Sequence, residues 1–273
     1  MGRPRTYNLN ENYFNIIDNS EKAYILGFIY ADGCVYGNYL TIGLSNKDIE
    51  ILEHIKKCLE YGGKIYNRCD KKTNKSYSIL SICSKNIVNS LIDLGVVRNK
   101  TYISKELPMY DKKFEWAFLR GFFDGDGSIY INMRKDRAQT IEYTICFSGN
   151  LSVLTQLKNI LYEYNISSSN IRNRHDTEES CMLEIRGSIN IEKMFTLMYD
   201  DGFFLKRKKE LFDNFNIMLT TLTKRRLSDD TKNEILRLYN LKIRQSEIAN
   251  ILNLPKSSVR GAIQRLKKYG KIK

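Results

Sequence analysis

Two copies of one unusual segment constrain what this chain can fold into. The segment "ILGFIYADG" spans residues 25–33, and "FLRGFFDGDG" spans residues 118–127. Both are apolar for most of their length, and both end in a small residue, an aspartate and a glycine, so that Asp32 and Asp126 hold the same position. An internal repeat of this kind indicates a chain built from two related units.

The residues that follow each copy predict the same order of elements. Alternating apolar residues in "CVYGNYLTIGLS" (34–45), "SIYINMR" (128–134) and "TIEYTICFS" (140–148) are typical of half-buried strands. In each half a helical segment, a second hairpin and a further helix follow. We therefore predict an α+β fold of two pseudo-symmetric αββαββα repeats, residues 20–110 and 111–222.

The spacing of small residues predicts how the two repeats meet. Gly27 and Ala31 are four residues apart, as are Gly121 and Gly125, which places two side-chain-poor positions on one face of each motif helix. Two such faces can pack with their backbones unusually close. We expect the motif helices to form a pair between the repeats, with Asp32 and Asp126 side by side. Gly33 stands where a C-terminal helix glycine is expected.

Two carboxylates at adjacent helix ends require positive charge. The helix dipole disfavours an acidic residue there by a few tenths to ~1 kcal/mol, and the two carboxylates repel each other. Mg²⁺ takes oxygen ligands, and metals shared by carboxylates suit phosphodiester hydrolysis. We predict that Asp32 and Asp126 are catalytic metal ligands. The alternative is a small-residue helix interface whose aspartates only cap or face solvent.

The motif pair resembles the twin signature of the LAGLIDADG homing endonucleases, and the resemblance covers about residues 20–222. Two copies in one chain resemble the monomeric members, which implies an antiparallel sheet in each half and a saddle over the DNA major groove. It also implies site-specific double-strand cleavage, as in intron homing, with two or three divalent ions bound by Asp32 and Asp126. Mg²⁺ is the expected cofactor, with Mn²⁺ as a substitute.

The resemblance also implies a basic residue shortly before the last helix of each half. Lys100 and Lys208 match that position and would be catalytic residues that position water. In the second half Lys206 or Lys209 could be the true equivalent, because that segment is one residue longer. The alternative is that these lysines only touch phosphate or solvent.

A polar residue at the end of the second strand is a further expected member of the site. It maps to Asn46 in the first half, as a catalytic residue, and to Gly149 in the second, with Asn150 next to it. That departure predicts a poorer second pocket. The earlier acidic position of the motif is Tyr30 in one copy and Asp124 in the other, so no metal role is assigned there.

Basic and amide side chains in the predicted hairpins are the expected DNA contacts. Arginine pairs with guanine, Asn and Gln pair with adenine, and lysine meets mainly phosphate. The alternative for each is simple solvation. The candidates are Lys64, Arg68, Lys71, Lys72 and Lys75 in the first half and Arg134, Lys135, Arg137, Arg172 and Arg174 in the second, with Asn67, Asn74, Asn132, Gln139 and Asn173 among them.

The last fifty residues form a separate basic unit. From Lys224 onward the chain has 14 Lys and Arg against four Asp and Glu, so this segment holds most of the net charge of +13. Ser228 is a good N-cap for a first helix, and two further helical patterns flank a turn at residues 253–255. This resembles a helix-turn-helix over residues 223–273, with a plain trihelical unit as the alternative. Its exposed positions would be Lys256, Ser257, Ser258, Arg260, Gln264 and Lys267.

The N-terminal segment and the cysteine and histidine content bear on which other binding or metal sites the chain could have. Residues 1–19 form an N-terminal arm whose "GRPR" resembles an AT-hook core, with a disordered tail as the alternative. Six scattered cysteines without a C-x-x-C pair favour reduced thiols over a disulfide frame or a zinc site. His54 and His175 form no His-rich pattern, and no P-loop is present.

These features predict an intracellular monomer that binds double-stranded DNA at a long asymmetric site. No membrane partner is expected, and the host compartment would be bacterial or phage-infected cytoplasm, or an organelle. The alternative function is a non-cleaving transcription regulator or an RNA-splicing maturase on the same fold. The two retained aspartates favour cleavage, because a pure binder does not need both.

Overall fold

The computed structural model describes residues 6–70, 74–96, 106–108, 110–134, 140–174, 180–224 and 227–268, with the side chains of 132–134, 140–141, 216–224, 257 and 268 left out. The chain divides into two compact units, Met1–Phe215 and Asn216–Lys273. Each unit is described by itself. No helix in the described part of the chain is both long enough and apolar enough to cross a membrane.

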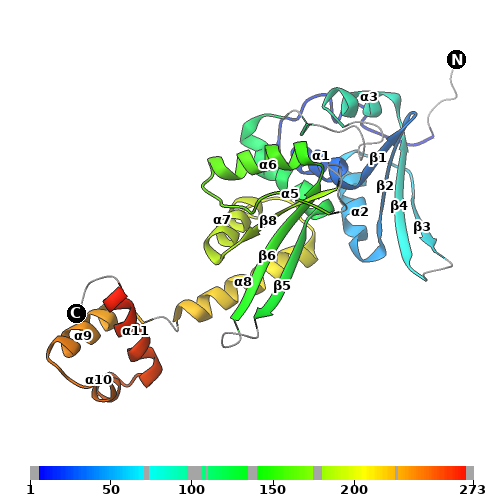
Figure 1. Cartoon of the computed structure of the whole chain (residues 1–273). Helices are drawn as coiled ribbons and strands as arrows, with labels where there is room; N and C mark the ends of the chain where they lie inside the picture. Colours follow the sequence, from blue (N-terminus) through cyan, green and yellow to red (C-terminus); the bar gives the residue numbers. More distant parts are fainter. Residues whose placement is uncertain are drawn as a thin grey trace. The chain divides into compact units, whose positions relative to one another are not determined.

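The larger unit contains two repeats with the same element order (Figure 1). The first consists of α1 (Ser20–Asp32), β1 (Gly33–Tyr36), β2 (Tyr39–Ser45), a 3₁₀ turn η1 (Asn46–Asp48), α2 (Ile49–Cys58), β3 (Ile65–Cys69), β4 (Ser76–Cys83) and α3 (Lys85–Asp93). The second consists of η2 (Lys112–Phe114), α5 (Glu115–Asp126), β5 (Ser128–Arg134), β6 (Thr140–Gly149), α6 (Leu151–Glu163), β7 (Arg172–Asn173), β8 (Cys181–Arg186) and α7 (Ser188–Met198). A long helix, α8 (Lys206–Lys224), follows α7. The predicted α+β class and αββαββα order are confirmed.

Each repeat has one four-stranded antiparallel sheet. The strand orders are β1-β2-β4-β3 and β5-β6-β8-β7, so the two sheets have the same topology. In the first sheet Ile42 pairs with Leu80, and both side chains are buried. The alternate positions of β2 are half-buried or exposed, because successive residues of a strand point to opposite faces. The first sheet therefore presents an apolar face to the helices and leaves its other face uncovered.

Helices α1 and α5 pack against each other where the repeats meet (Figure 1). Every residue of α1 from Ala23 to Ala31 is buried. A Cβ added to Gly121 would lie 1.9 Å from the carbonyl oxygen of Tyr24, and one added to Gly27 would lie 2.1 Å from that of Phe118. No larger residue fits at such a separation, so the predicted backbone-to-backbone helix pair is confirmed.

The role of Gly33 differs from the prediction. Its φ of −74° and ψ of 147° are extended, not the left-handed geometry of a glycine C-cap. Strand β1 begins at this residue, and its N–H still donates to the Ile29 carbonyl oxygen. A Cβ there would lie 2.6 Å from that same oxygen. The glycine is therefore required by the space at the helix-to-strand corner, not by its dihedral angles.

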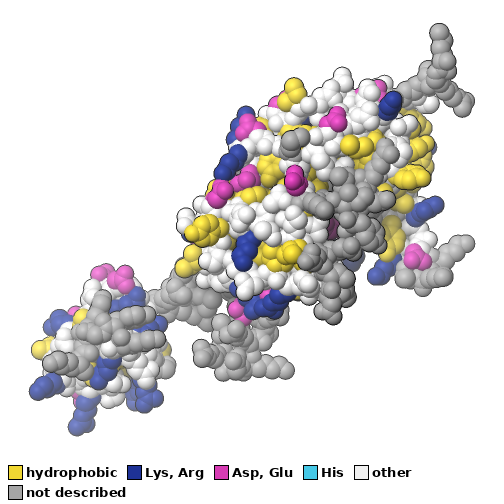
Figure 2. All heavy atoms as spheres, turned by 45° about the horizontal axis from the view of Figure 1, so that its top comes forward, with side chains coloured by type: hydrophobic (Ala, Val, Ile, Leu, Met, Phe, Trp, Pro, Cys, Tyr) yellow, Lys and Arg dark blue, Asp and Glu magenta, His cyan; other side chains and the backbone are white. Residues whose placement is uncertain are grey.

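The smaller unit contains α9 (Asp229–Asn240), α10 (Gln245–Ile251) and α11 (Lys256–Lys268) after the end of α8. The Ser228 hydroxyl accepts a hydrogen bond from the N–H of Thr231 at 3.1 Å, which confirms it as an N-cap. A separate apolar core holds the three helices together: Ile235, Leu238, Ile248, Ala249, Val259, Ala262 and Ile263. Lys and Arg side chains are prominent on the surface of this unit (Figure 2).

Candidate active site

Asp32 and Asp126 are the last residues of the paired helices α1 and α5. Both side chains are exposed. A Cβ built on Gly125 would lie 2.3 Å from Ala31 Cβ and 3.3 Å from Oδ2 of Asp32. The carboxylate of Asp32 therefore lies beside the last turn of α5, next to the residue that precedes Asp126. The close contact of the helices continues to the ends that hold the two aspartates.

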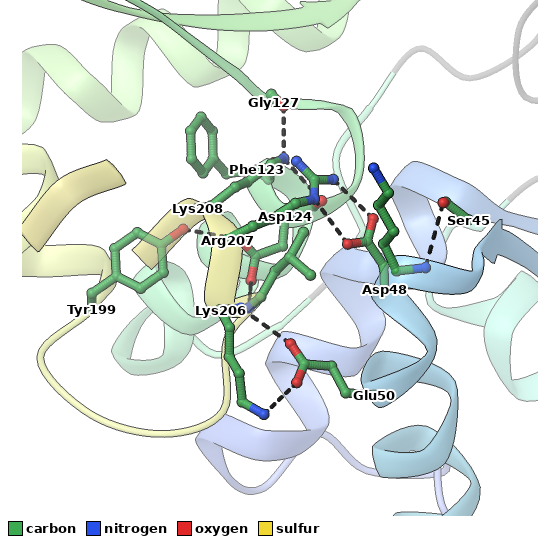
Figure 3. Close-up of polar contacts among 12 residues, drawn as sticks. Ser45, Asp48, Glu50, Phe123, Asp124, Gly127, Tyr199, Lys206, Arg207 and Lys208 are labelled. Carbon is green, nitrogen blue, oxygen red and sulfur yellow. Dashed lines mark hydrogen bonds and ion pairs between the residues drawn. The ribbon is translucent and has the colours of Figure 1, made fainter. Parts of the chain in front are cut away.

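The ammonium of Lys208 supports the end of α5 (Figure 3). Its Nζ donates to the carbonyl oxygens of Asp124 at 2.9 Å, of Gly127 at 2.6 Å, and of Phe123. The side chain is only 3% exposed. An ammonium has three protons, and all three are used here. The structure thus places Lys208 under the motif helix with its protons on backbone carbonyl groups, whereas the sequence predicted a catalytic lysine that positions water.

The electrostatics of Lys208 connect it with three acids. Burial lowers the pKa of Lys208 to about 8, and attraction to Asp124, Asp32 and Asp126 acts in the opposite direction. A positive charge at a helix C-terminus also offsets the negative end of the macrodipole. The buried ammonium therefore compensates part of the charge that two aspartates bring to this end of the helix pair.

Asp124 is a buried structural centre that sequence reasoning did not identify. Its carboxylate accepts hydrogen bonds from the hydroxyl of Tyr24 at 3.0 Å, the hydroxyl of Tyr199 at 2.9 Å and the N–H of Leu205 at 2.7 Å. Burial raises the pKa of Asp124, and Lys208 and the three hydrogen bonds oppose that shift. These contacts join α1, the end of α7 and the start of α8 to α5. In the first motif the matching Tyr30 donates instead to the carbonyl oxygen of Glu106 at 3.1 Å.

The first turn of α8 also connects the two repeats. Arg207 binds Asp48 with two parallel hydrogen bonds, Nε to Oδ1 at 2.9 Å and Nη2 to Oδ2 at 3.0 Å. Lys206 Nζ lies 2.6 Å from Glu50 Oε2 (Figure 3). Lys209 instead pairs with Asp213 in its own helix. Among these consecutive basic residues, Lys208 alone has a hydrogen bond to the motif helix, which distinguishes it from the alternatives Lys206 and Lys209.

A family model described as "LAGLIDADG-like domain" matches residues 19–93 and 113–198, which together include both motifs and both sheets. This chain belongs to the LAGLIDADG-like domain family.

Solved structures of this family share the fold. The "LAGLIDADG Meganuclease I-AabMI Bound to Uncleaved DNA" aligns with a TM-score of 0.55 at 15% identity, covering 78% of this chain and 94% of that chain. The "I-LtrWI LAGLIDADG homing endonuclease bound to target DNA" aligns with a TM-score of 0.52 at 15% identity, covering 81% and 94%. At these identities the similarity shows the fold alone.

One curated relative is much longer than this chain. The "Probable translation initiation factor IF-2" of Thermococcus kodakarensis is 27% identical over 192 residues, which is 68% of this chain. The match spans only 15% of the length of that protein.

The polar strand-end positions of the two LAGLIDADG repeats differ in structure. Asn46 is exposed in η1, and its Oδ1 accepts a hydrogen bond from the Ser78 hydroxyl at 2.8 Å. Gly149 is the last residue of β6, and Asn150 next to it caps α6 by accepting from the N–H of Val153 at 2.9 Å. The side chain of Asn150 thus already serves the helix. Lys100 lies outside the described residues.

The predicted DNA contacts of the LAGLIDADG repeats lie mostly at the surface. Lys64, Lys75 and Arg68 are exposed around β3 and β4, and Arg172 and Arg174 are exposed around β7. Arg174 Nη1 donates to the Ser148 hydroxyl at 3.4 Å. Arg134 lies in β5, but its side chain is not described. Lys71, Lys72, Lys135, Arg137 and Gln139 lie outside the described residues.

The candidate positions of the smaller unit lie on α11. The side chains of Lys256, Arg260, Gln264 and Lys267 are exposed and that of Ser258 is half-buried, whereas the side chain of Ser257 is not described. Val259, Ala262 and Ile263 lie on the buried face of the same helix. The helix is therefore amphipathic, with a polar and basic outer face.

Exposed tyrosines on the uncovered face of the first sheet were missed by the sequence analysis. Tyr36, Tyr39, Tyr66 and Tyr77 are between 37% and 77% exposed. Tyr77 pairs with Arg68 across β4 and β3, so the two side chains share a face. The strand patterns could have predicted these exposed tyrosines, because they occupy the positions that alternate with buried aliphatic residues.

Proposed function

We propose that this protein is a site-specific double-strand DNA endonuclease that hydrolyses phosphodiester bonds as a monomer. The observation that carries the proposal is the placement of Asp32 and Asp126 at the ends of a helix pair packed at backbone contact. The LAGLIDADG proteins with this fold include a meganuclease and a homing endonuclease whose structures were solved with DNA. That similarity supports the same substrate class here.

The residues at the helix ends fit divalent metal ions. Asp32 and Asp126 are exposed carboxylates, and Mg²⁺ prefers such hard oxygen ligands. The oxygens of Asp124 are buried and already accept three hydrogen bonds, so this third carboxylate does not fit the ligand set. Asp32 and Asp126 would hold two or three Mg²⁺ or Mn²⁺ ions. Such ions supply activation of water and stabilisation of the leaving oxygen.

The residues of the protein itself would position the carboxylates and the DNA. Lys208 would fix the end of α5, so that Asp126 keeps its place relative to Asp32. The exposed face of the first sheet, with Arg68 beside Tyr77, would lie in the major groove, which admits a two-stranded ribbon. Since the two sheets carry different side chains, the target would be long and asymmetric.

The smaller unit would act as a helix-turn-helix domain. Helix α11 carries Lys256, Arg260 and Gln264 on its exposed face, and it follows α10 after a short turn. In a helix-turn-helix the second helix enters the major groove. We propose domains at 20–110, 111–222 and 223–273 for the two repeats and this unit.

A cleavage assay tests the proposal. The protein is incubated with DNA from the flanks of its own gene, in the presence of Mg²⁺ or Mn²⁺. We expect double-strand cleavage by the natural protein and by Asp93→Asn, an exposed carboxylate of α3 that serves as the control. Asp32→Asn and Asp126→Asn should lose cleavage and keep DNA binding. Tight binding without cutting in either metal would instead favour a non-cleaving transcription regulator.

A further inference from the structure

Three side chains of metal-ligating type meet away from the motif aspartates. Glu21 lies in the first turn of α1, and His54 and Cys58 lie one turn apart on α2. One ligand atom from each lies within 4.8 Å of the other two. His54 Nε2 is 3.4 Å from Glu21 Oε1 and 3.6 Å from Cys58 Sγ. One imidazole nitrogen is thus close to both a carboxylate oxygen and a thiol sulfur.

A buried hydroxyl at the same place is a second, independent observation. The Tyr13 side chain is 6% exposed, and its hydroxyl has no partner with hydrogen-bond geometry among the described residues. The Tyr13 hydroxyl lies beside the cluster, where Cys58 and Glu21 are among its electrostatic neighbours and the Cys58 sulfur is close enough to interact with it. A buried polar group without a partner is costly. A thiolate at Cys58 would give the hydroxyl an acceptor.

The separations match those of ligands on one tetrahedral zinc ion. With Zn–N and Zn–O near 2.0–2.1 Å and Zn–S near 2.3 Å, tetrahedral angles put N and O about 3.4 Å apart and N and S about 3.6 Å apart. The distances from His54 Nε2 to Glu21 Oε1 and to Cys58 Sγ agree with these two values. Imidazole nitrogen, thiolate sulfur and carboxylate oxygen are all established zinc ligands. The cysteine spacing predicted no zinc site, because these ligands come from different types of residue on two helices.

We propose that Glu21, His54 and Cys58 form a zinc site, with water in the fourth position. Glu21 is half-exposed and His54 is 15% exposed, so solvent can reach that position. On binding, the Cys58 thiol loses its proton to solvent as the zinc–sulfur bond forms. The Tyr13 hydroxyl then donates to the sulfur, as a residue that positions the ligand.

The site would fasten the N-terminal segment and α1 to α2. That segment already lies against the end of α2. The N–H of Asn10 donates to the Leu59 carbonyl oxygen at 2.9 Å, and the N–H of Gly62 donates to the Asn8 carbonyl oxygen at 3.0 Å. The role is structural and does not depend on the proposed nuclease. The nitrogen and sulfur donors also select a softer ion than the two motif aspartates would.

Cobalt spectroscopy on the full-length reduced protein tests the proposal. Co²⁺ is added as a zinc substitute, because a thiolate-to-cobalt charge-transfer band reports sulfur ligation that Asp32 and Asp126 cannot produce. We expect the natural protein and Cys69→Ser, an exposed thiol in β3, to give this band at one ion per chain, and Zn²⁺ to abolish it. Cys58→Ser and His54→Gln should lose the band.

Zinc affinity and thermal stability give the second readout. At free Zn²⁺ about 100 times the Kd, we expect the Tm of the natural protein to rise by about 5–10 °C. Tyr13→Phe should weaken zinc affinity about tenfold, the effect of losing a residue that orients a ligand. The proposal is overturned if the natural protein gives no thiolate band, or if folded Cys58→Ser binds zinc as tightly as Cys69→Ser does.

Discussion

The buried ammonium of Lys208 donates a hydrogen bond of 2.6 Å to the carbonyl oxygen of Gly127, the residue that follows Asp126. Lys208 and Gly127 are far apart in the sequence, and this contact lies directly after the end of the second motif helix. The same Nζ also holds the last carbonyl groups of that helix. The position of Asp126 therefore depends on a side chain from α8.

Substitution of Lys208 should reduce the stability of the folded protein. Lys208→Met removes the ammonium that donates to the buried carbonyl groups of Phe123, Asp124 and Gly127, of which that of Phe123 keeps the Gly127 N–H as a second donor. We expect a loss of about 2–4 kcal/mol in the free energy of unfolding. Lys209→Met is the matched control, since Lys209 pairs with Asp213 within α8, lies over the rings of Phe204 and Phe212, and has no hydrogen bond to α5. This substitution should cost less than about 1 kcal/mol. Urea denaturation measures the free energy of unfolding of both variants. Equal losses in the two variants would contradict this role for Lys208.

The stability of the folded protein should depend on pH because of the lowered pKa of Lys208. Burial lowers the pKa of Lys208 in the folded protein to about 8, below its ordinary value of 10.5. Between these values the unfolded chain binds more protons, so the contribution of Lys208 to the free energy of unfolding rises with pH there. Below the folded-state pKa the full cost of burying the charge remains.

Denaturation at about pH 7.5 and 9.5 of the natural protein and Lys208→Met measures this contribution. The stability of the natural protein relative to the variant should increase at the higher pH, because only the natural protein has this proton to lose. A difference that stays constant or shrinks would show that burial does not lower the pKa of Lys208 in the folded state.

A methyl group at the helix contact should separate the repeats. In Gly121→Ala the new Cβ would lie 1.9 Å from the Tyr24 carbonyl oxygen, so one helix must move. We expect a cost of about 3 kcal/mol, and a larger loss of cleavage than of DNA binding because Asp32 and Asp126 move apart. In the control, Gly43→Ala, the Cβ meets only Ile79 Cγ1 at 3.9 Å, and stability should change by less than about 0.5 kcal/mol. Similar stability in both variants would contradict the close packing.

Removal of the smaller unit should weaken DNA binding in a salt-dependent way. A chain that ends before Leu227 loses most of the net charge, including Lys256 and Arg260 of α11. Fewer neutralised phosphates mean lower affinity and a shallower dependence of log K on log salt, by about 0.9 for each lost contact. Binding titrations at several salt concentrations measure the slope. An unchanged affinity and slope would contradict a DNA-binding role for this unit.

The LAGLIDADG motifs and their surroundings predicted the fold from local patterns. Alternating apolar residues placed the strands, and the four-residue spacing of Gly27 and Ala31 indicated which helix faces meet. These features are readable in sequence because they depend on periodicity and on residue size. The serine cap at Ser228 was readable for the same reason, since a cap bonds to residues only three positions away.

Tertiary structure alone decided which polar side chains act together. The sequence favoured Lys208 and left Lys206 and Lys209 open as alternatives, and only packing shows that Lys208 lies under α5. The hydrogen bonds of buried Asp124 likewise join residues that are distant in the sequence. The same holds for the cluster in which Glu21 meets His54 and Cys58. The physical reason is that hydrogen bonds and metal ligation require interatomic distances correct to a few tenths of an ångström. The folded backbone sets these distances, and the spacing of residues in the sequence does not predict them.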